Sequence, residues 1–392
     1  MSAATRSHVS STPFAVVGCA LFVLLLDGNL PTPLYAVYRE QFGFSGTTLT
    51  LVFAVYTIAL IPALLVFGQL SDRIGRRPVI IGGLALAALG MLMLALAQST
   101  AELFLARAVQ GCALGTAVGT VPAALVELEE SGDHGRAAMA TVLGQSGGSA
   151  AGPLVAGLLA QWAPAPRQLC YLVGIAATVV VAAGVWRIPE PREERGEWRL
   201  QKPSVPPEIR TAFARASLTC ACVWAVGALF LSVVPSYAAE LLETNNLALL
   251  GAISATMLAM ACVAQAICLR GAMTPELAQL SGLVLLIAGL GALVLAFPLH
   301  TLALVLAAAV LAGSGLGLGY FGSQAEINGL APAERRGEVT AAFITCVYST
   351  VSVTVISTGL LSDLTTLSTA VAIVGGAVAT LAAGATVWQL RR

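Results

Sequence analysis

The chain has 392 residues, of which 57% are apolar and only 10% are charged, and its formal net charge is zero. Soluble domains carry about a quarter charged residues, because their surfaces face water. The composition therefore excludes a soluble globular protein and predicts an all-α integral membrane protein.

Twelve stretches are apolar and long enough to cross a bilayer as helices, which takes about 20 residues each. In the first half they are 14–37, 47–69, 78–98, 103–127, 137–162 and 167–187. In the second half they are 211–238, 246–268, 276–296, 300–325, 339–361 and 367–389. We therefore expect two six-helix bundles, over 1–187 and 211–392, joined by a hydrophilic linker over 188–210.

The basic residues lie almost entirely in every second loop. With the N-terminus in the cytoplasm, seventeen of them fall on the cytoplasmic side, whereas only Arg39 and Arg167 fall outside. Loops rich in Lys and Arg stay on the cytoplasmic side of a membrane. We therefore expect a multi-pass protein of a bacterial cytoplasmic (inner) membrane with both termini in the cytoplasm. One lysine against nineteen arginines is typical of a GC-rich bacterial genome.

The two halves resemble each other in layout. The turn 129–136 precedes the fifth span, and the turn 331–338 precedes the eleventh span about 202 residues later. Parallel six-helix repeats of this kind hold a substrate at the interface between the halves. The sequence therefore indicates a membrane carrier.

The first span contains an ionisable residue, Asp27. It lies about 13 residues into the helix and thus about 20 Å along it, near the middle of the membrane. Ionisable residues at such a depth are costly and mark functional sites. Asp27 is therefore a candidate for carrying a proton.

A motif of glycines and charges follows the second span. Its main positions are Gly68, Leu70, Asp72, Arg73, Gly75, Arg76 and Arg77. We expect Gly68 to let two helices approach closely, Gly75 to permit a tight turn, and Asp72 to exchange ion pairs with the arginines. A simple cytoplasmic anchor would explain the arginines, but neither Asp72 nor the two glycines.

This motif resembles the signature of the major facilitator superfamily at every main position. The resemblance implies a fold of twelve transmembrane helices in two parallel six-helix bundles, which transports a solute by alternating access. It also implies that the motif, with Glu127 at the end of the fourth span, forms a latch that holds one conformation. Asp72, Arg73 and Arg76 are its expected ion-pairing members.

The fourth span contains Arg107, followed by Gln110 and Gly111. This pattern resembles a second motif of the superfamily, whose arginine is associated with proton coupling. Arg107, Gly111 and Gly115 recur every four residues and lie on one face of the helix. We expect that face to pack closely against a neighbouring helix.

Asp27 and Arg107 reach similar depths from opposite sides of the membrane, so we expect them to face each other. Two interpretations remain open. Movement of Arg107 changes the proton occupancy of Asp27, because a nearby positive charge favours the ionised form and burial favours the protonated form. Alternatively, the two residues form a permanent buried salt bridge.

Small residues recur along the fifth span. They are Gly144, Gly148, Gly152, Pro153 and Gly157. Four-residue spacing lets helix backbones touch, and Pro153 can kink the helix. The run resembles the motif typical of drug–proton antiporters of the superfamily, although Ala156 stands where a glycine is frequent. Ordinary membrane packing is the alternative interpretation.

Further polar residues within the spans are candidates for lining a substrate cavity. They are Asn29, Tyr35, Tyr56, Gln110, Gln145, Trp224, Gln265, Tyr320, Gln324 and Tyr348. Each could equally well form a hydrogen bond between helices. Glu326 and Asp363 lie close to span ends, where we expect solvated positions. The coupling charges are therefore expected in the N-terminal half.

The sequence contains no phosphate-binding loop for ATP, which disfavours primary active transport. No grouping of residues predicts a metal site, a cofactor, a catalytic centre or nucleic-acid binding. We predict a monomeric, proton-coupled efflux antiporter for a small, amphipathic or drug-like molecule, with protons, substrate and the lipid bilayer as its partners. The alternative is a proton-coupled uptake symporter for a sugar or organic acid. A membrane receptor or enzyme is disfavoured.

Overall fold

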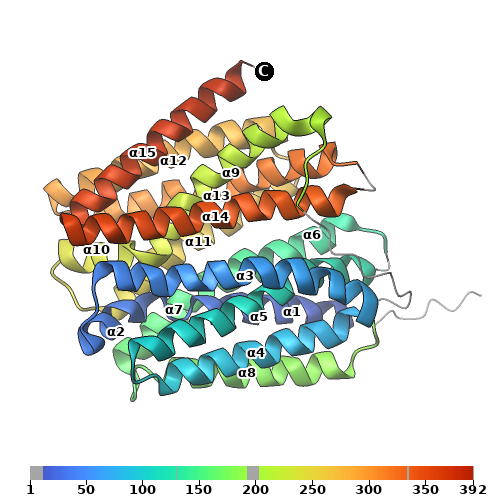
Figure 1. The fold of residues 1–392 in the computed structure, drawn as a ribbon, viewed down its shortest axis with the longest axis horizontal. Coiled ribbons are helices and arrows are strands. Elements are labelled where there is room, and N and C mark those ends of the chain that lie inside the picture. Colours follow the sequence, from blue (N-terminus) through green and yellow to red (C-terminus); the bar gives the residue numbers. More distant parts are fainter. Residues whose placement is uncertain (1–11, 130, 192–202, 333–334, 392) are drawn as a thin grey trace, which may run out of the picture.

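The computed structural model describes residues 12–129, 131–191, 203–332 and 335–391. Throughout these residues the chain forms helices joined by short connections, without strands. Figure 1 shows two stacked groups of helices, with the N-terminal half below and the C-terminal half above. The structure confirms the predicted all-α membrane fold.

The N-terminal half crosses the membrane six times. Its elements are α1 (Thr12–Asn29), η1 (Thr32–Leu34), α2 (Tyr35–Phe42), α3 (Gly46–Ile74), α4 (Arg76–Leu96), α5 (Thr100–Glu127), α6 (His134–Val142), η2 (Leu143–Gly147), α7 (Gly148–Trp162) and α8 (Leu169–Arg187). The first crossing is broken between α1 and α2 at Pro31 and Pro33, because proline lacks the backbone N–H that would continue the helix.

The C-terminal half repeats this layout. Its elements are η3 (Pro207–Ile209), α9 (Arg210–Ser232), α10 (Val234–Leu241), α11 (Leu247–Leu269), α12 (Pro275–Leu299), α13 (Leu302–Leu330), α14 (Arg336–Leu364) and α15 (Leu367–Leu390). The first crossing is again broken, between α9 and α10, just before Pro235. Of the predicted linker, residues 192–202 lie outside the described residues, as do 1–11 and 392 at the ends of the chain.

Eleven helical stretches among the described residues are long and apolar enough to cross a membrane. The remaining crossing, predicted over 137–162, is not one regular helix. It consists of α6, the π-helical segment η2 and α7 in direct succession. Single π-helical turns inside α-helices frequently occur at functional sites, and η2 carries Gln145 and Ser146. The fifth crossing therefore has an irregular middle that its hydropathy does not reveal.

Two equivalent hydrogen bonds reveal the internal repeat. Tyr38 donates its hydroxyl to the carbonyl of Leu94 at 3.3 Å, and Tyr237 donates to the carbonyl of Leu293 at 2.8 Å. Each bond joins residues 56 positions apart. The same anchor thus fastens the first crossing to the third in both halves.

The glycines of α5 and α13 repeat in the same way. Gly111 and Gly115 lie against the backbone of α3, so that an added side chain would collide with the carbonyls of that helix. Gly313 and Gly317 lie against the backbone of α11 in the same manner. The predicted close packing of the face that carries Arg107 is therefore present, and its neighbour is α3.

The two ends of the molecule differ in charge. We call the end that carries Arg73, Arg76 and Arg77 at the α3–α4 connection, and Arg335 and Arg336 at the start of α14, the basic end. The opposite end is the far end. In Figure 1 the basic end is on the right.

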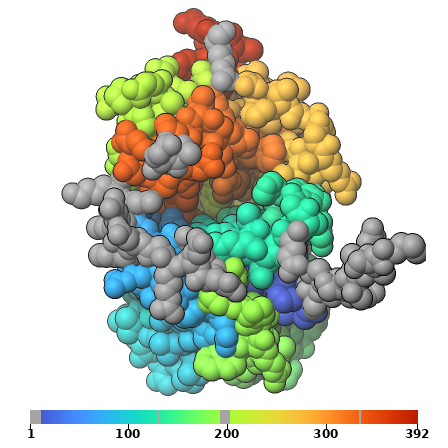
Figure 2. Space-filling model, turned by 90° about the vertical axis from the view of Figure 1, so that its right-hand side faces the viewer, coloured from blue at the N-terminus to red at the C-terminus, as the bar shows by residue number. Residues whose placement is uncertain are grey.

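The halves meet along two helix pairs, α3 with α14 and α7 with α11 (Figure 1). Toward the far end these pairs touch, since side chains added at Gly157 and Gly359 would collide with α11 and with Thr50 of α3. Toward the basic end a cavity of about 370 Å³ lies between α3 and α5 of one half and α14 of the other. Figure 2 looks onto this end and shows a recess between the halves. The molecule is therefore closed at the far end and open at the basic end.

Candidate functional site

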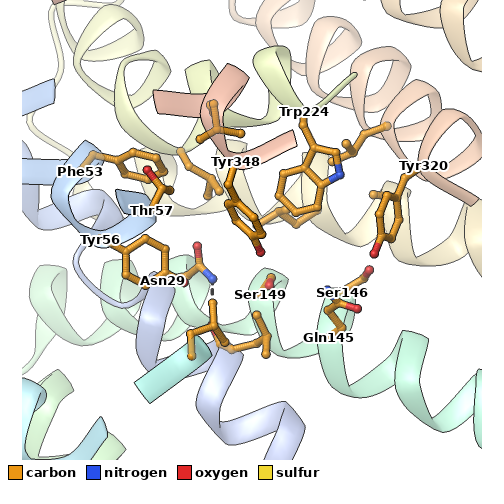
Figure 3. A pocket seen from close by; sticks show the side chains of 18 of the residues that line it. Asn29, Phe53, Tyr56, Thr57, Gln145, Ser146, Ser149, Trp224, Tyr320 and Tyr348 are labelled. Atoms are coloured by element: carbon orange, nitrogen blue, oxygen red, sulfur yellow. Dashed lines mark hydrogen bonds between the residues drawn. The ribbon is translucent and has the colours of Figure 1, made fainter. Parts of the chain in front are cut away.

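A central cavity lies between the two halves (Figure 3). The volume in which the centre of a water molecule fits is about 70 Å³. This corresponds to about five water molecules. Its polar and aromatic lining consists of Asn29, Phe53, Tyr56, Thr57, Gln145, Ser146, Ser149, Trp224, Gln265, Tyr320 and Tyr348. Its aliphatic lining consists of Leu25, Leu114, Ala228, Leu231, Leu258, Ala261, Leu316 and Val351.

Most of the polar residues proposed from the sequence lie around this cavity. They are Asn29, Tyr56, Gln145, Trp224, Gln265, Tyr320 and Tyr348. Tyr35 and Gln110 lie instead beside Arg107, and Gln324 is outside the lining. The sequence reasoning missed four lining residues: Phe53 and Thr57, which lie within one turn of Tyr56 on α3, and Ser146 and Ser149 of the fifth crossing. That any lining residue contacts a substrate stays a prediction.

Three aromatic rings from the C-terminal half form one wall of the cavity. The ring of Trp224 lies 5.7 Å from that of Tyr320 and 6.0 Å from that of Tyr348, measured between centroids. The indole Nε1 of Trp224 is buried and has no hydrogen-bond partner among the described residues. Because buried donors are normally satisfied, this nitrogen is suited to a ligand that accepts a hydrogen bond.

Three neighbouring cavities lie between the centre of the molecule and the basic end. A second, smaller cavity shares Trp224, Tyr320 and Tyr348 with the central one. It also shares Ile344 with the 370 Å³ cavity, which extends to Asp72. The three cavities are therefore neighbours, and the aromatic wall stands between the central cavity and the basic end.

Arg107 is buried behind the cavity wall, with 1% of its surface exposed. It donates to the carbonyl of Gly28 at 2.9 Å and to the side-chain oxygen of Gln110 at 2.7 Å. Gln110 in turn donates to the carbonyl of Asp27 at 3.2 Å. The guanidinium carbon lies 4.2 Å from the ring centroid of Tyr56. Tyr56 therefore stands between Arg107 and the cavity.

Asp27 is equally buried, with 1% exposure, but it points elsewhere. Its Oδ2 accepts a hydrogen bond from Thr178 of α8 at 2.6 Å, and its Oδ1 has no hydrogen-bond partner among the described residues. Within this part of the chain Asp27 and Arg107 form no ion pair. The expectation that they face each other is therefore wrong, because the backbone of α1 separates the two side chains.

The arginine motif converges on Arg76, which is 5% exposed. Arg76 forms ion pairs with Asp72 at 2.8 Å and with Glu127 at 2.9 Å, and donates to Ser71. The structure thus brings together three expected members of the latch, from α3, α4 and α5. Arg73 is exposed and lies outside this cluster.

The connection after the second crossing is shorter than the motif suggested. Asp72 and Arg73 belong to the last turn of α3, and only Gly75, with φ +104°, interrupts the helices before α4. Glu190 accepts hydrogen bonds from the backbone N–H groups of Arg76 and Arg77 at 2.6 and 3.2 Å. A carboxylate is favourable at this helix N-terminus, and no motif in the sequence points to Glu190.

The remaining motif residues have separate surroundings. The guanidinium of Arg77 lies 5.4 Å from the ring of Trp186. Gly68, expected at a close helix approach, has no atom within 4 Å of the place where a side chain would stand, and it lines the open cavity at the basic end. In this conformation the space beside Gly68 is therefore free.

The glycine run of the fifth crossing packs on two helices. Gly144 lies against Leu21, and Gly148 and Gly152 lie against backbone carbonyls of α1. Gly157 and the carbonyl of Pro153 contact α11 of the other half. The run therefore serves close packing both within the N-terminal half and across the interface.

The C-terminal half contains a buried ion pair that contradicts the expected position of Glu326. Arg215 of α9 and Glu326 of α13 are 2.6 Å apart, with side chains 8% and 3% exposed. Gln279 donates to Glu326 at 2.7 Å and accepts from Gln389 at 2.7 Å. Glu326 is therefore not solvated, because α13 continues past it and turns it into the bundle.

Asp363 joins the two halves at the far end. Its carboxylate accepts hydrogen bonds from the backbone N–H groups of Gly46 and Thr47, at 2.9 and 3.0 Å. These groups begin α3, whereas Asp363 ends α14. Asp363 is exposed, as expected for a span end, but it also holds the N-terminus of a helix of the other half.

Residues 17–355 match the family described as Major Facilitator Superfamily. The inner membrane transport protein YajR of Escherichia coli is 32% identical over 174 residues, 44% of this chain and 38% of that protein. The puromycin resistance protein pur8 of Streptomyces alboniger is 29% identical over 192 residues, 48% of this chain and 37% of that protein. The 3-(3-hydroxy-phenyl)propionate transporter of E. coli is 28% identical over 224 residues, 56% of this chain and 53% of that protein.

The chain therefore spans less than two thirds of the length of these relatives. Among solved structures, a POT family transporter in complex with 5-aminolevulinic acid matches with a TM-score of 0.79. The identity is 13%, and 96% of each chain is covered. At this identity the likeness shows a shared fold alone.

Proposed function

The chain belongs to the major facilitator superfamily, and we propose that it is a proton-coupled antiporter that exports a small amphipathic molecule across a bacterial cytoplasmic membrane. The observation that carries this proposal is Asp27, a buried carboxyl with no cationic partner among the described residues. An ionised carboxylate in such a place is expensive. It is therefore suited to bind and release a proton as its surroundings change.

Three consecutive residues of α1 connect the proton site with the cavity. Asp27 contacts Thr178, the carbonyl of Gly28 binds Arg107, and the side chain of Asn29 lines the central cavity. A substrate that displaces α1 at Asn29 would alter both other contacts. This arrangement supports coupling between substrate binding and the proton occupancy of Asp27 without a direct pair between Asp27 and Arg107.

The cavity series supports alternating access. The positive-inside rule predicts that the basic end faces the cytoplasm, and we propose that the present conformation is the one that opens toward the cytoplasm. Rocking of the halves would break the contacts of Asp363 at the far end and close the cavity beside Gly68 and Asp72. We propose that the Arg76 cluster is a latch for the present conformation, in which its ion pairs with Asp72 and Glu127 are formed. We propose that the carrier acts as a monomer and catalyses no covalent reaction.

The glycine run of α7 and the likeness to a puromycin resistance protein favour export. The alternative is proton-coupled uptake of an organic acid, which the likeness to a 3-(3-hydroxy-phenyl)propionate transporter favours. The two functions move substrate in opposite directions relative to the proton gradient.

Everted membrane vesicles with an acidified lumen separate the two functions. For the antiporter we expect puromycin to accumulate in the lumen and protons to leave it, whereas a symporter would not accumulate 3-(3-hydroxyphenyl)propionate there. Asp27→Asn should abolish the proton response, because the amide cannot be ionised. Asp133→Asn is the matched control, since Asp133 caps α6 outside the membrane. Unchanged stoichiometry in Asp27→Asn would refute the role of Asp27.

A further inference from the structure

The lining of the central cavity lacks formal charge. None of its described residues is an Asp, Glu, Lys, Arg or His. Two buried ionisable residues of the N-terminal half stand behind it, Asp27 against α8 and Arg107 behind the ring of Tyr56. Burying an ion without a partner is costly. The cavity is therefore matched to a ligand that is uncharged when bound.

Aromatic side chains occupy both sides of this uncharged space. Phe53 and Tyr56 project from α3, and Trp224, Tyr320 and Tyr348 project from the C-terminal half (Figure 3). Aromatic rings pair favourably with other rings in offset or edge-to-face arrangements, with centroids about 4.5–7 Å apart. A planar ring in the ligand would continue the contacts that Trp224 already makes with its neighbours.

An aromatic box can also attract a cation through the faces of its rings. Here one face of Tyr56 is already occupied, because the guanidinium of Arg107 lies 4.2 Å from the ring centroid. A ligand cation beside Tyr56 would therefore meet positive charge behind the ring. An anion would meet the electron-rich faces of the rings, which repel it. Arg107 cannot compensate this repulsion, because its guanidinium already donates hydrogen bonds to Gly28 and Gln110. Both ions are disfavoured.

The polar atoms of the lining indicate which hydrogen-bonding groups the ligand contains. The indole Nε1 of Trp224 is a buried donor without a partner among the described residues. By contrast, Gln265 donates to Ser146 at 3.0 Å, and Asn29 donates to the carbonyl of Leu25 at 2.8 Å. A ligand oxygen or nitrogen that accepts a hydrogen bond would satisfy Trp224.

We infer that the central cavity takes an uncharged aromatic molecule that accepts a hydrogen bond from Trp224 Nε1. This inference rests on the proposed transport function and names its substrate class. It departs from the broader expectation of an amphipathic molecule, because it excludes permanent cations and anions.

Binding to the full chain in lipid nanodiscs tests this inference, by equilibrium dialysis without a proton gradient. Three probes share one ring and one chain length: 3-phenylpropanamide, 3-phenylpropanoate and (3-phenylpropyl)trimethylammonium. We expect the amide to bind at least about tenfold more tightly than either ion, since neither ion finds a partner. Tighter or equal binding of an ion overturns the inference, as does failure of all three probes to bind.

The hydrogen bond is tested from both sides. Trp224→Phe should weaken binding of the amide by about threefold to tenfold, because it removes one donor and keeps a ring. Trp162→Phe is the matched control, since Trp162 is 70% exposed at the end of α7. On the ligand side, propylbenzene has no acceptor and should bind more weakly than the amide to the unaltered chain. Equal binding of propylbenzene and the amide overturns the hydrogen bond whether or not the variant folds.

Failure of this inference is distinguishable from failure of the proposed function. If the amide binds but moves no protons in everted vesicles, the antiport proposal fails and the assignment of the cavity stands. If only the ions bind and are transported with protons, the antiport proposal stands and the assignment of the cavity is refuted.

Discussion

The two halves of the molecule share a packing skeleton and differ in their buried charges. Tyr38 and Tyr237 make equivalent hydrogen bonds, and Gly111 and Gly313 press equivalent helices together. In the C-terminal half Arg215 pairs directly with Glu326. The skeleton is thus duplicated, while the polar chemistry is particular to each half.

The C-terminal half thus holds a directly paired acid and base, whereas Asp27 and Arg107 of the N-terminal half can exchange their hydrogen-bond partners. Breaking a direct buried pair leaves an uncompensated charge, which is strongly unfavourable. In the N-terminal half Asp27 and Arg107 bond to a hydroxyl, an amide and a carbonyl, and such neutral partners can be exchanged at lower cost. We interpret the C-terminal pair as structural and the N-terminal charges as the functional ones.

The largest expected effect concerns the fixed pair. Arg215→Met removes the cation beside a buried carboxylate and should lower the free energy of unfolding by about 3–5 kcal/mol. Thermal unfolding in detergent measures the loss. The double variant Arg215→Met with Glu326→Leu should regain most of it, because no charge is then left without its partner. A single variant as stable as the wild type would show that the pair is not structural.

The second effect tests whether the skeleton is equivalent in both halves. Gly111→Ala and Gly313→Ala place a methyl group against backbone carbonyls of α3 and α11, and each should cost about 1–3 kcal/mol of stability. Gly291→Ala is the control, because nothing lies within 4 Å of its added carbon. Clearly unequal losses at 111 and 313 would contradict the equivalence of the two helix contacts.

The third effect concerns the joint between the halves at the far end. Asp363→Asn leaves one carbonyl oxygen for two backbone N–H groups of α3. We expect a cysteine placed at Thr50 to react about threefold to tenfold faster with a membrane-impermeant maleimide, since a lost hydrogen bond favours opening by that order. The exposed Cys19 and Cys346 are replaced by serine in this background. Asp133→Asn should leave the rate unchanged. Equal rates in both variants would show that Asp363 does not hold the two halves together at the far end.

The smallest effect concerns the duplicated tyrosines. Tyr237→Phe removes one buried hydrogen bond to a carbonyl and should cost about 1 kcal/mol. Tyr38→Phe should cost at least as much, because its hydroxyl also bonds to that of Tyr171 at 3.1 Å. The same unfolding assay measures both. If Tyr237→Phe is clearly the more damaging variant, the two bonds are not energetically equivalent.

The fold was largely predictable because hydropathy along the chain reports directly on burial in lipid. All twelve crossings were located, including the one that the π-helical segment η2 interrupts. That interruption was not foreseen, because Gly144 to Gly148 are as compatible with a regular helix as with a π-helical turn. Likewise, hydropathy does not show that α3 continues through Asp72 to Ile74, since charge marks the membrane boundary without marking the end of the helix.

The site was only partly predictable. Polar residues in apolar stretches pointed to the cavity, and seven of the ten proposed residues line it. Phe53 was missed because an aromatic residue in a membrane span carries no signal that separates a cavity from lipid. Glu326 was misplaced because its distance from the end of the helix was judged by hydropathy, and hydropathy does not show which way a side chain points.

The sequence by itself determined the membrane class, the number of crossings and the family, because apolar length and local motifs are properties of neighbouring residues. Only the tertiary structure decided the partners: Asp27 with Thr178 rather than Arg107, Arg215 with Glu326, and Asp363 with the start of α3. These pairs join residues more than 100 positions apart in the chain. The choice depends on which face each helix turns toward its neighbours, and that is settled by packing of the whole bundle.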